Sequence, residues 1–589
     1  MTMRHSTQPL RLGLGPLRSL SALLVGAASL TALPACDAAP TRGCPGTEIF
    51  IDGECVQPHM IRLNSVGYLP TRAKLASYVG DETSFQVMTR EGRVVFEGSA
   101  TTEVSARDSG ERVRIADFSE LEEPGEYWLE VPGVGRSPDF RIGDDVFHEP
   151  LVASLLALHG QRCGTAVELE WGEGTFKHAA CHLEEAGLDY IDGEQGTKDA
   201  TGGWHDAGDY GKYTVNGAFA VAFLLQAYED FPDRLKDLEL PIPERGGELP
   251  DILDEARFQL EWLLKMQLAD GSVAHKVTAK NFEGNIMPEA DHAPRFFVPA
   301  GTAATGTFAA TLALAARVYE PFDPDFAATC LEAAQQAFDF LLENREDITP
   351  NQSDFRTGGY EAPGYDDERA WAAAELWETT GDPAALEEFE LLARELGMSM
   401  LLNFDWSNST NLALATYLRS EREGRDPDLV ESIRATTLST AQSLVENWKS
   451  HGYGRSVGSI YYWGINGVIA RTAFNLVAAH RLDPDPTYLD AITGQLDHLF
   501  GRNPYGRSYL TGVGYRPPQF PHHRPSMASG GRFPWPGLLI GGPHSELFSD
   551  PAANVPEGLT WEDRAENYIH NEIAINWNTA LVYALVAAE

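Results

Sequence analysis

PDILDEARFQLEWLL, at residues 250–264, has apolar residues at intervals of three and four behind a Pro-Asp pair. That periodicity places the apolar side chains on one face of a helix, and Pro or Asp suits a helix's first turn. Twelve stretches of this kind follow Phe147, including those that begin near Asp323 and Asp426. Paired helices with one apolar face each can stack and bury those faces. The sequence therefore predicts a mainly α domain, an (α/α)6 barrel.

Short β-forming runs alternate with turn signals ahead of the helices. Residues 74–79, 85–88 and 127–131 are such runs, and Asp-Glu, Glu-Gly and Pro-Gly pairs separate them. Short strands closed by turns are typical of an antiparallel sandwich. We therefore expect a small β-sandwich over residues 59–145 and the helical domain over 146–589.

The first residues resemble an export signal. Three arginines precede an apolar run at residues 20–33, which ends in small residues before Cys36 and is short for a membrane span. The sequence LPAC at 33–36 resembles a bacterial lipobox apart from its proline, and in a lipobox the cysteine is lipidated. We expect a signal segment over 1–36 and a tether over 37–58 closed by a Cys44–Cys55 disulfide. The protein would be secreted or held in the cell envelope as a lipoprotein.

The chain is strongly acidic, with 86 acidic against 45 basic residues and a net charge of −41. This charge repels nucleic acid and anionic lipid head groups, so neither is an expected partner. A solubility adaptation to a salty habitat explains the charge equally well. Membrane contact is expected only through the lipid anchor.

The longest non-helical segments, 164–211 and 501–566, are where a site is expected, because long loops in compact domains are usually functional. The first ends in Asp206 and Asp209, two carboxylates among glycines and aromatics just before a helix. This pattern suits acid–base catalysis in a cleft, a calcium loop or helix capping. Glu572 lies among apolar and aromatic residues at the start of the last helix. Burial there would raise its pKa, as a general acid requires, although an ordinary polar helix face explains it as well.

Three long motifs, in the right order, resemble the signatures of glycoside hydrolase family 9. The aspartate motif is GWHDAGDY at 203–210, the histidine motif runs from Ser508 to Arg524, and the C-terminal motif runs from Trp561 to Thr579. The resemblance covers roughly residue 60 to the end. It includes an N-terminal immunoglobulin-like module of the kind that many such cellulases carry. It implies an inverting enzyme that hydrolyses β-1,4-glucan.

The resemblance also implies roles for the matching residues. Asp209 is the base that activates water, Asp206 helps to hold that water, and Glu572 is the acid that protonates the leaving oxygen. Inversion requires a gap of about 6.5–9.5 Å between acid and base, so that a water fits behind the sugar ring. Three further residues are expected to bind and orient the reacting groups: His522, Arg524 and Asp563.

Aromatic residues near these motifs could stack on the apolar faces of sugar rings, although core packing explains any one of them as well. Arg524 and four aromatic residues are expected to contact substrate: Trp204, Tyr210, Trp463 and Tyr568. In the stretch WGIN at 463–466, isoleucine stands where the family usually has serine. No contact from a serine hydroxyl is expected there.

Cys163, Cys181, His182 and His205 offer two thiols and two imidazoles, a set suited to a closed tetrahedral zinc site. Their spacing alone leaves a Cys163–Cys181 disulfide open in an exported protein. Relatives with the immunoglobulin-like module look similar at these positions and bind zinc there, so the resemblance implies a structural zinc. With four protein ligands, it would brace the loop before Asp206 and not activate water.

Calcium is common in the family, and residues 357–360 with the acidic run 366–368 resemble one of its oxygen-rich calcium loops. Residues 361–363 read Glu-Ala-Pro where relatives often have Gly-Asp. We expect calcium at Asp366 and Asp367. No organic cofactor is expected.

The leading hypothesis is an endo-acting β-1,4-glucanase on cellulose or mixed-linkage glucan, acting as a monomer. An exo-acting member that trims cello-oligosaccharides or glucosaminides stays open, because only the loops closing the cleft could separate the two. A non-catalytic glycan-binding lipoprotein is the alternative from another class. It would keep the aromatics and lose a carboxylate, so the intact Asp206, Asp209 and Glu572 argue against it.

Overall fold

The computed structural model describes residues 49–51, 54–56 and 59–589. The expected signal segment, the lipobox cysteine Cys36 and Cys44 of the expected Cys44–Cys55 disulfide lie outside the described residues, so that disulfide stays a prediction. Within the described part of the chain, no helix is long and apolar enough to cross a membrane.

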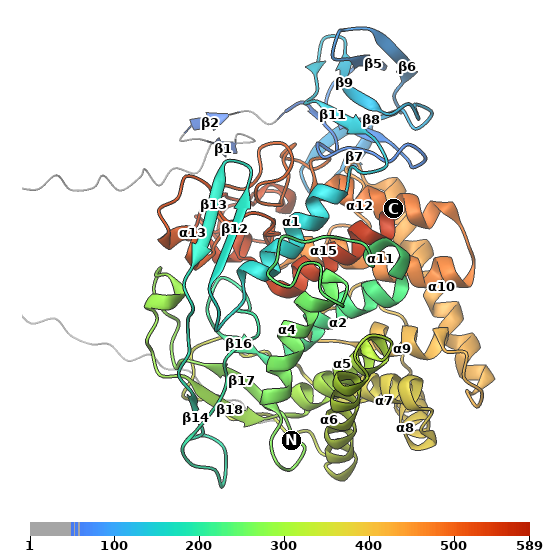
Figure 1. Ribbon diagram of the computed structural model, residues 1–589. Helices are drawn as coiled ribbons and strands as arrows, with labels where there is room; N and C mark the ends of the chain where they lie inside the picture. The colour runs from blue at the N-terminus through green and yellow to red at the C-terminus, as the bar shows by residue number, and fades with distance from the viewer. Residues whose placement is uncertain (1–48, 52–53, 57–58) are drawn as a thin grey trace, which may run out of the picture. The chain divides into compact units, whose positions relative to one another are not determined.

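Residues 61–142 form a β-sandwich of two antiparallel sheets (Figure 1). One sheet has the order β10-β9-β5-β6, with β11 also paired to β9, and the other has the order β3-β4-β8-β7. Buried and more exposed side chains alternate along β9, as expected for a strand with one face on a core. The strands, with the preceding hairpin, are β1 Ile49–Ile51, β2 Glu54–Val56, β3 Ile61–Arg62, β4 Leu75–Tyr78, β5 Ser84–Thr89, β6 Val94–Ser99, β7 Val104–Ala106, β8 Glu111–Asp117, β9 Gly125–Val131, β10 Gly135–Arg136 and β11 Phe140–Ile142.

The helical domain consists of an inner ring and an outer layer of helices. Successive inner helices pack against one another. The ring closes between α9 and α11, where Asn411 Nδ2 donates to Asn475 Oδ1 at 2.8 Å, and between α15 and α2. Each outer helix packs against an inner one. The inner helices are α2 Thr214–Asp230, α5 Thr302–Tyr319, α7 Asp366–Thr380, α9 Thr410–Arg419, α11 Ile465–Leu482 and α15 Ile575–Ala588; the outer ones are α1 His148–Gly160, α4 Asp251–Met266, α6 Pro324–Glu343, α8 Pro383–Glu395, α10 Pro427–Ser450 and α12 Pro486–Leu499.

The two layers differ in sequence pattern. Nearly every residue of α5 is buried, whereas the buried residues of α6 recur at intervals of three and four. A helix that is apolar all round belongs inside, and one with a single apolar stripe belongs at the surface. The predicted fold class, a mainly helical domain preceded by a β-sandwich, is confirmed.

Asp-Pro pairs begin four of the outer helices. The side chains of Asp323, Asp382, Asp426 and Asp485 each accept a hydrogen bond from a backbone N–H in the first turn, and proline occupies the next position. The aspartate satisfies a donor without an intrahelical partner, and proline supplies no such donor. These pairs therefore fix where α6, α8, α10 and α12 start.

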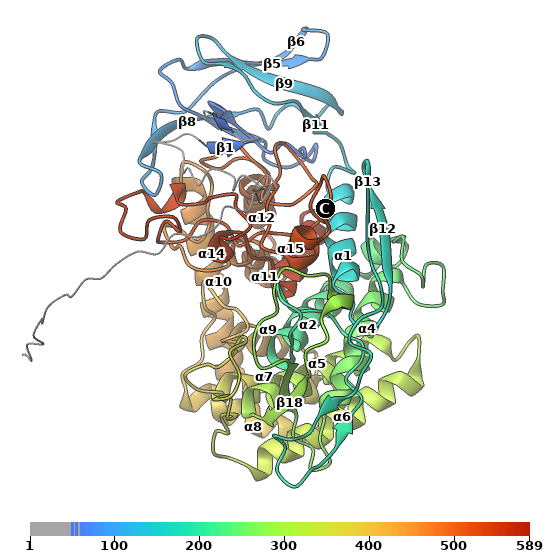
Figure 2. The same cartoon turned by 90° about the vertical axis from the view of Figure 1, so that its left-hand side faces the viewer.

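The expected long loop 164–211 contains a hairpin, β12 Val167–Trp171 with β13 Gly174–His178, which contacts α1 (Figure 2). Beyond it lies a small sheet that ends in the strand just before α2. Its order is β15-β14-β18-β17-β16. Its strands are β14 Ala186–Gly187, β15 Thr197–Lys198, β16 Lys212–Tyr213, β17 Ala274–Thr278 and β18 Phe296–Ala300.

The expectation that Glu572 lies at the start of the last helix is wrong. A short helix, α14 Tyr568–Asn571, ends before Glu572, which is extended with φ −61° and ψ 150°, and α15 starts at Ile575. The extended backbone pairs with two loops, because Glu572 lies opposite His522 and Ile573 lies opposite Ile540. Hydrogen bonds to these loops replace those of a helix.

Candidate active site

The loop with Asp206 and Asp209 folds back on itself just before α2. The backbone N–H of Asp206 donates to the Gly211 carbonyl at 3.1 Å. A Cβ on Gly208 would lie 2.3 Å from the carbonyl oxygen of His522. Glycine at 208 therefore lets the two predicted loops pack directly against each other.

Asp206 is buried, and its two carboxylate oxygens have different partners. Asn216 Nδ2 donates to Oδ1 at 2.7 Å, and the Tyr360 hydroxyl donates to Oδ2. Burial, followed by the negative charge of Asp209, raises the pKa of Asp206 to about 7. Near neutral pH this carboxyl therefore exists in both protonation states.

Asp209 is held through one oxygen only. Its Oδ2 accepts from the Gly211 N–H at 3.0 Å and from the Tyr213 hydroxyl at 2.8 Å. The Tyr213 hydroxyl in turn accepts from the Gly358 N–H at 3.2 Å. Oδ1 has no hydrogen-bond partner among the described residues, so it is free to accept a hydrogen bond.

Glu572 lines the same cleft as the two aspartates. Burial, and then the charges of Asp209 and Asp206, raise the pKa of Glu572 well above its usual value. The Ile575 N–H donates to the Asp206 carbonyl at 2.9 Å, so the segment with Glu572 is bonded to the aspartate loop. The raised pKa favours the protonated form of Glu572, the form in which a carboxyl can donate a proton.

The cleft has a volume of about 400 Å³ and largely aromatic walls. Trp463 is 44% exposed, and its ring centroid lies 5.4 Å from that of Tyr568, itself exposed. These two rings present a surface on which a sugar could stack. The aromatic residues that line the cleft are Tyr213, Phe282, Tyr360, Trp406, Tyr462, Trp463 and Trp577.

Trp204 and Tyr210, both expected to contact substrate, are buried and do not line the cleft. Trp204 Nε1 donates to Glu255 Oε1 at 2.8 Å, and the Tyr210 hydroxyl donates to the Ile286 carbonyl at 2.6 Å. Their placement does not fit sugar stacking. Their indole and phenol rings instead fix the position of the aspartate loop, because their polar tips satisfy partners inside the domain.

His522 and Arg524 hold the histidine loop beside Glu572 and the aspartate loop. His522 Nδ1 lies 2.7 Å from the Ala565 carbonyl, and burial, followed by the charge of Arg524, lowers the pKa of His522. Arg524 forms an ion pair with Glu283 at 2.7 Å and donates to the Gly208 carbonyl. The imidazole is therefore neutral, with its Nδ1–H donating to the carbonyl, and Nε2 remains an acceptor.

Asp563 is buried away from the cleft. It forms an ion pair with Arg507 at 2.8 Å and accepts from the N–H groups of Gln519 and Phe520. It thus fixes the loop that leads into His522. A direct contact with substrate does not fit this placement.

Four partners of the site were not anticipated from the sequence: Asn216, Tyr213, Glu283 and Tyr360. Tyr213 lies four positions after Asp209, where only its proximity could have suggested a role. Tyr360 lies 154 positions from Asp206, and nothing in the local sequence pairs them. Glu283 likewise reaches Arg524 from 241 positions away.

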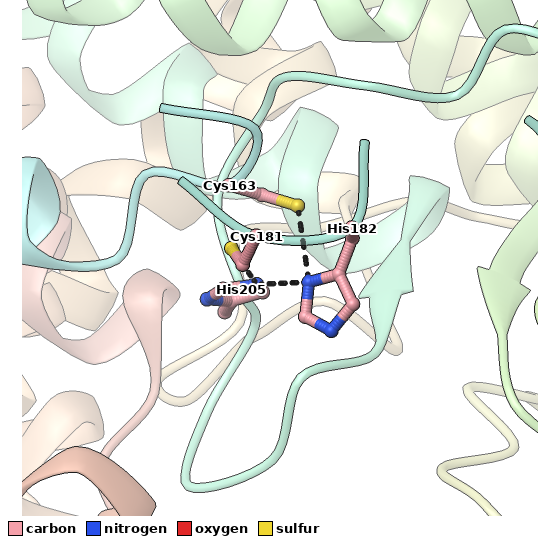
Figure 3. Close-up of side chains that lie close together, drawn as sticks. All are labelled: Cys163, Cys181, His182 and His205. Carbon is pink, nitrogen blue, oxygen red and sulfur yellow. Dashed lines mark hydrogen bonds between the residues drawn. The ribbon is translucent and has the colours of Figure 1, made fainter. Parts of the chain in front are cut away.

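The two cysteines and two histidines of the predicted metal site meet in the structure (Figure 3). Cys163 Sγ lies 3.6 Å from His182 Nδ1, Cys181 Sγ lies 3.8 Å from His205 Nε2, and the two imidazole nitrogens are 3.3 Å apart. All four potential ligand atoms lie within 4.8 Å of one another. Both thiols are free, so this arrangement favours a metal site over a Cys163–Cys181 disulfide.

Neighbouring groups orient this cluster. Asp291 Oδ2 lies 3.2 Å from His182 Nε2 and orients Nδ1 toward the cluster. The His205 N–H donates to the Gln161 carbonyl at 2.7 Å, and the Cys163 N–H donates to the Gly203 carbonyl at 2.8 Å. The cluster therefore joins the end of α1 to the residue just before Asp206.

The acidic run at the start of α7 was expected to bind calcium. Asp367 Oδ2 accepts from both the N–H and the hydroxyl of Ser409. Glu368 is buried, and neither of its carboxylate oxygens has a hydrogen-bond partner among the described residues. Burial, and then the charge of Asp367, raise the pKa of Glu368. Asp366 begins the helix beside them.

Two protein-family models match the chain, both in the order that the fold shows. The model for glycosyl hydrolase family 9 matches residues 147–585. The model for the cellulase N-terminal ig-like domain matches residues 57–136. The helical domain and the sandwich are thus each matched by their own family.

Individual relatives agree with this assignment. Endoglucanase D of Acetivibrio thermocellus is 45% identical over 527 residues, covering 89% of this chain and 82% of that protein. A cellodextrinase of Butyrivibrio fibrisolvens is 33% identical over 547 residues, covering 89% of this chain and 98% of that protein. The crystal structure of a Zn-binding triple mutant of the family 9 endoglucanase J30 matches with a TM-score of 0.83 and 35% identity, covering 88% of this chain and 99% of that one. The chain therefore belongs to glycosyl hydrolase family 9, as an inverting glycoside hydrolase with an N-terminal ig-like domain.

Proposed function

We propose that the protein is an endo-acting β-1,4-glucanase that hydrolyses cellulose or mixed-linkage β-glucan. The observation that carries the proposal is the meeting of Glu572, Asp206 and Asp209 in one cleft with aromatic walls. Glucose rings are apolar on both faces, so Trp406 and Trp463 offer them stacking surfaces. The likeness to Endoglucanase D supports endo action on a glucan.

In the proposed reaction, Asp209 accepts a proton from water through Oδ1, the oxygen that its neighbours leave free. The water attacks the anomeric carbon from the face opposite the leaving group, while Glu572 gives its proton to the leaving oxygen. The new C–O bond forms as the glycosidic bond breaks, so the configuration inverts. Asp206, fixed by Asn216 and Tyr360, orients the attacking water.

The first test uses the chain without residues 1–36 on carboxymethyl cellulose, barley β-glucan, xylan and chitosan oligomers. Endo action predicts a fast fall in viscosity on the glucans while few reducing ends have formed. Inversion predicts that NMR shows the α-anomer of the product first.

Each other outcome points to a different conclusion. Hydrolysis confined to short cello-oligosaccharides or glucosaminides would favour an exo-acting enzyme, an activity closer to the cellodextrinase relative. A β-anomer formed first would exclude the single displacement. Folded protein that is inactive on all of these glycans would favour a non-catalytic glycan-binding lipoprotein.

A structural zinc is our proposal for Cys163, Cys181, His182 and His205. Two thiolates and two imidazoles are the donor set that zinc prefers, and the four ligand atoms are already gathered. The bound metal would link three separate segments and fix His205, the residue before Asp206. No ligand position would stay open for water, so its effect would be on stability.

Replacing one ligand, Cys181→Ser, should remove the zinc and lower the melting temperature by roughly 5–10 °C. Elemental analysis should find one zinc per wild-type chain and almost none in the variant. Cys330→Ser is the matched control, because Cys330 is another buried free thiol and lies outside the cluster. The Cys330→Ser protein should keep its zinc. Wild-type protein without zinc, or a variant that melts like the wild type, would contradict the proposal.

A calcium ion is proposed at the start of α7. A buried carboxylate whose oxygens have no partner, as in Glu368, is the state expected of a cation ligand. Asp366 and Asp367 supply further hard oxygen donors beside it. The ion would stabilise an inner helix.

For residues 1–58 we propose export with a lipid anchor at Cys36, on the strength of the sequence alone. The protein would then meet its glucan outside the cytoplasm, as a monomer. A membrane fraction that loses the protein after Cys36→Ser would support the anchor.

A further inference from the structure

The turn between β7 and β8 of the sandwich places a carboxylate inside the helical domain. Asp108, in that turn, is buried. Its Oδ2 accepts from His451 Nε2 at 2.9 Å, Arg455 Nη1 at 3.1 Å and the Tyr461 hydroxyl at 2.6 Å. All three donors belong to the segment that joins α10 to α11.

The carboxylate is well suited to hold that segment. Burial opposes its charge, but His451 and Arg455 outweigh burial and keep the pKa of Asp108 well below its usual value. Hydrogen bonds to an ionised acceptor are stronger than those between neutral groups. The lowered pKa favours the charged form of Asp108, whose Oδ2 accepts all three hydrogen bonds, while the buried Oδ1 has no partner among the described residues.

Arg455, which Asp108 holds, in turn contacts the residues that follow it in the segment. Its guanidinium lies over the Tyr461 ring, 3.9 Å from the centroid, and its Nη2 donates to the Ile460 carbonyl at 2.7 Å. Asp108 thus fixes Tyr461 directly, through the hydroxyl, and also through Arg455. The backbone at 460–461 is held from both sides.

The residues that follow form part of the cleft wall. Tyr462, Trp463 and Gly464 line the cleft that contains Glu572. A Cβ on Gly464 would lie 2.3 Å from the Trp577 ring, so this end of the segment is packed directly against α15. The other end is fixed at Tyr461. The exposed indole of Trp463 has no hydrogen bond to a described residue, so its position depends on these two attachments and on the Tyr568 ring, whose centroid lies 5.4 Å away.

The same turn also touches a segment that precedes Glu572 in the chain. The Gly558 N–H donates to the Asp108 carbonyl at 2.7 Å. A Cβ on Gly558 would lie 2.9 Å from that carbonyl oxygen and 3.0 Å from the Tyr461 hydroxyl. Residues 557–559 form the short 3-10 helix η2 ahead of the segment that leads to Glu572.

We infer that Asp108 is a positioning residue for substrate binding: from the sandwich, it sets Tyr462 and Trp463 in the cleft wall for the glucan chain. The inference rests on the proposed function, because it assigns these rings to a glucan. It gives the sandwich a role in catalysis without any glycan contact of its own. A merely structural contact between the sandwich and the helices would affect stability alone.

The test compares two Asp108 variants with a matched control in the chain without residues 1–36. Glu111 is the control, because it also joins sandwich to helical domain: Arg62 holds it, and the Tyr453 hydroxyl donates to it at 2.7 Å. The Glu111 side chain has no hydrogen bond or ion pair with residues 455–464. The measurements are kcat and KM on barley β-glucan, with the melting temperature of every variant.

Asp108→Ala should raise KM about tenfold, because a misplaced binding surface weakens substrate contacts, and kcat should change less than KM. Asp108→Asn keeps one acceptor oxygen and should raise KM only about threefold. Glu111→Gln should lower the melting temperature as much as Asp108→Asn, with KM unchanged. If Asp108→Ala fails to fold, Tyr461→Phe, which removes a single hydrogen bond, takes its place and should raise KM about threefold.

Unchanged KM in folded Asp108→Asn and Tyr461→Phe would overturn the inference. An equal rise in KM in Glu111→Gln would overturn it too, because the effect would then belong to the whole domain contact. Wild-type protein inactive on every glucan would instead sink the proposed function, so the two failures are distinguishable.

Discussion

Glu572→Gln should lower kcat on barley β-glucan by about 10³-fold with little change in KM, because the amide keeps the shape of the side chain and has no proton to give. The alkaline limb of the pH profile should change as well. The raised pKa of Glu572 keeps its proton above the usual pH range of a glutamate, and wild-type activity falls as pH rises through that pKa. The residual activity of the variant should show no such fall.

A substrate with a good leaving group tests this assignment most sharply. The dinitrophenolate of a dinitrophenyl cellobioside leaves without protonation, so Glu572→Gln should lose less than about tenfold in kcat on this substrate. Glu566→Gln is the matched control, since Glu566 is an exposed glutamate on the same segment and should behave as the wild type. An equal loss on both substrates would show that Glu572 is not the acid.

Asp209→Asn should lower kcat by about 10³-fold on both substrates, because water must be deprotonated whatever the leaving group. The amide retains an oxygen for the Tyr213 hydroxyl, so the loop should keep its shape. Tyr213→Phe keeps the carboxylate and removes one donor to it, and should cost only about tenfold. Steady-state kinetics on the glucan and on the aryl cellobioside check both.

The pattern across substrates separates the base from the acid. If Asp209→Asn regained near-wild-type kcat on the dinitrophenyl substrate, Asp209 would instead act on the leaving group. Retention of a tenth of the wild-type kcat on the glucan would exclude Asp209 as the base.

Much of the fold could be predicted from the sequence because its signals are local. An Asp-Pro pair determines where a helix starts without help from distant residues. Asp323 and Asp426 are examples, because their side chains cap the helices that follow. The all-round burial of α5 was harder to foresee, since its Ala- and Thr-rich composition fits several environments. The extended backbone at Glu572 escaped prediction because the loops that it pairs with are distant in sequence.

For the site, the motifs predicted which residues gather but not what each contacts. Asp206, Asp209, Glu572 and Trp463 share the cleft. Trp204 is a residue type expected to stack on sugars, yet its indole N–H donates to Glu255 inside the domain. Long-range partners of this kind leave no local signature, because three-dimensional proximity sets them rather than spacing.

The closure of the inner ring has a consequence for how the enzyme comes into being. Asn216 of α2 and Asn576 of α15 lie 3.5 Å apart although 360 positions separate them in the chain. Closing so long a loop costs entropy before any contact repays it, and folding dominated by such contacts is slow. The base and the acid lie on opposite sides of this closure. We therefore expect catalytic activity to be among the last properties that the folding chain acquires. The rate at which activity returns after denaturation should then report the rate at which the whole ring closes.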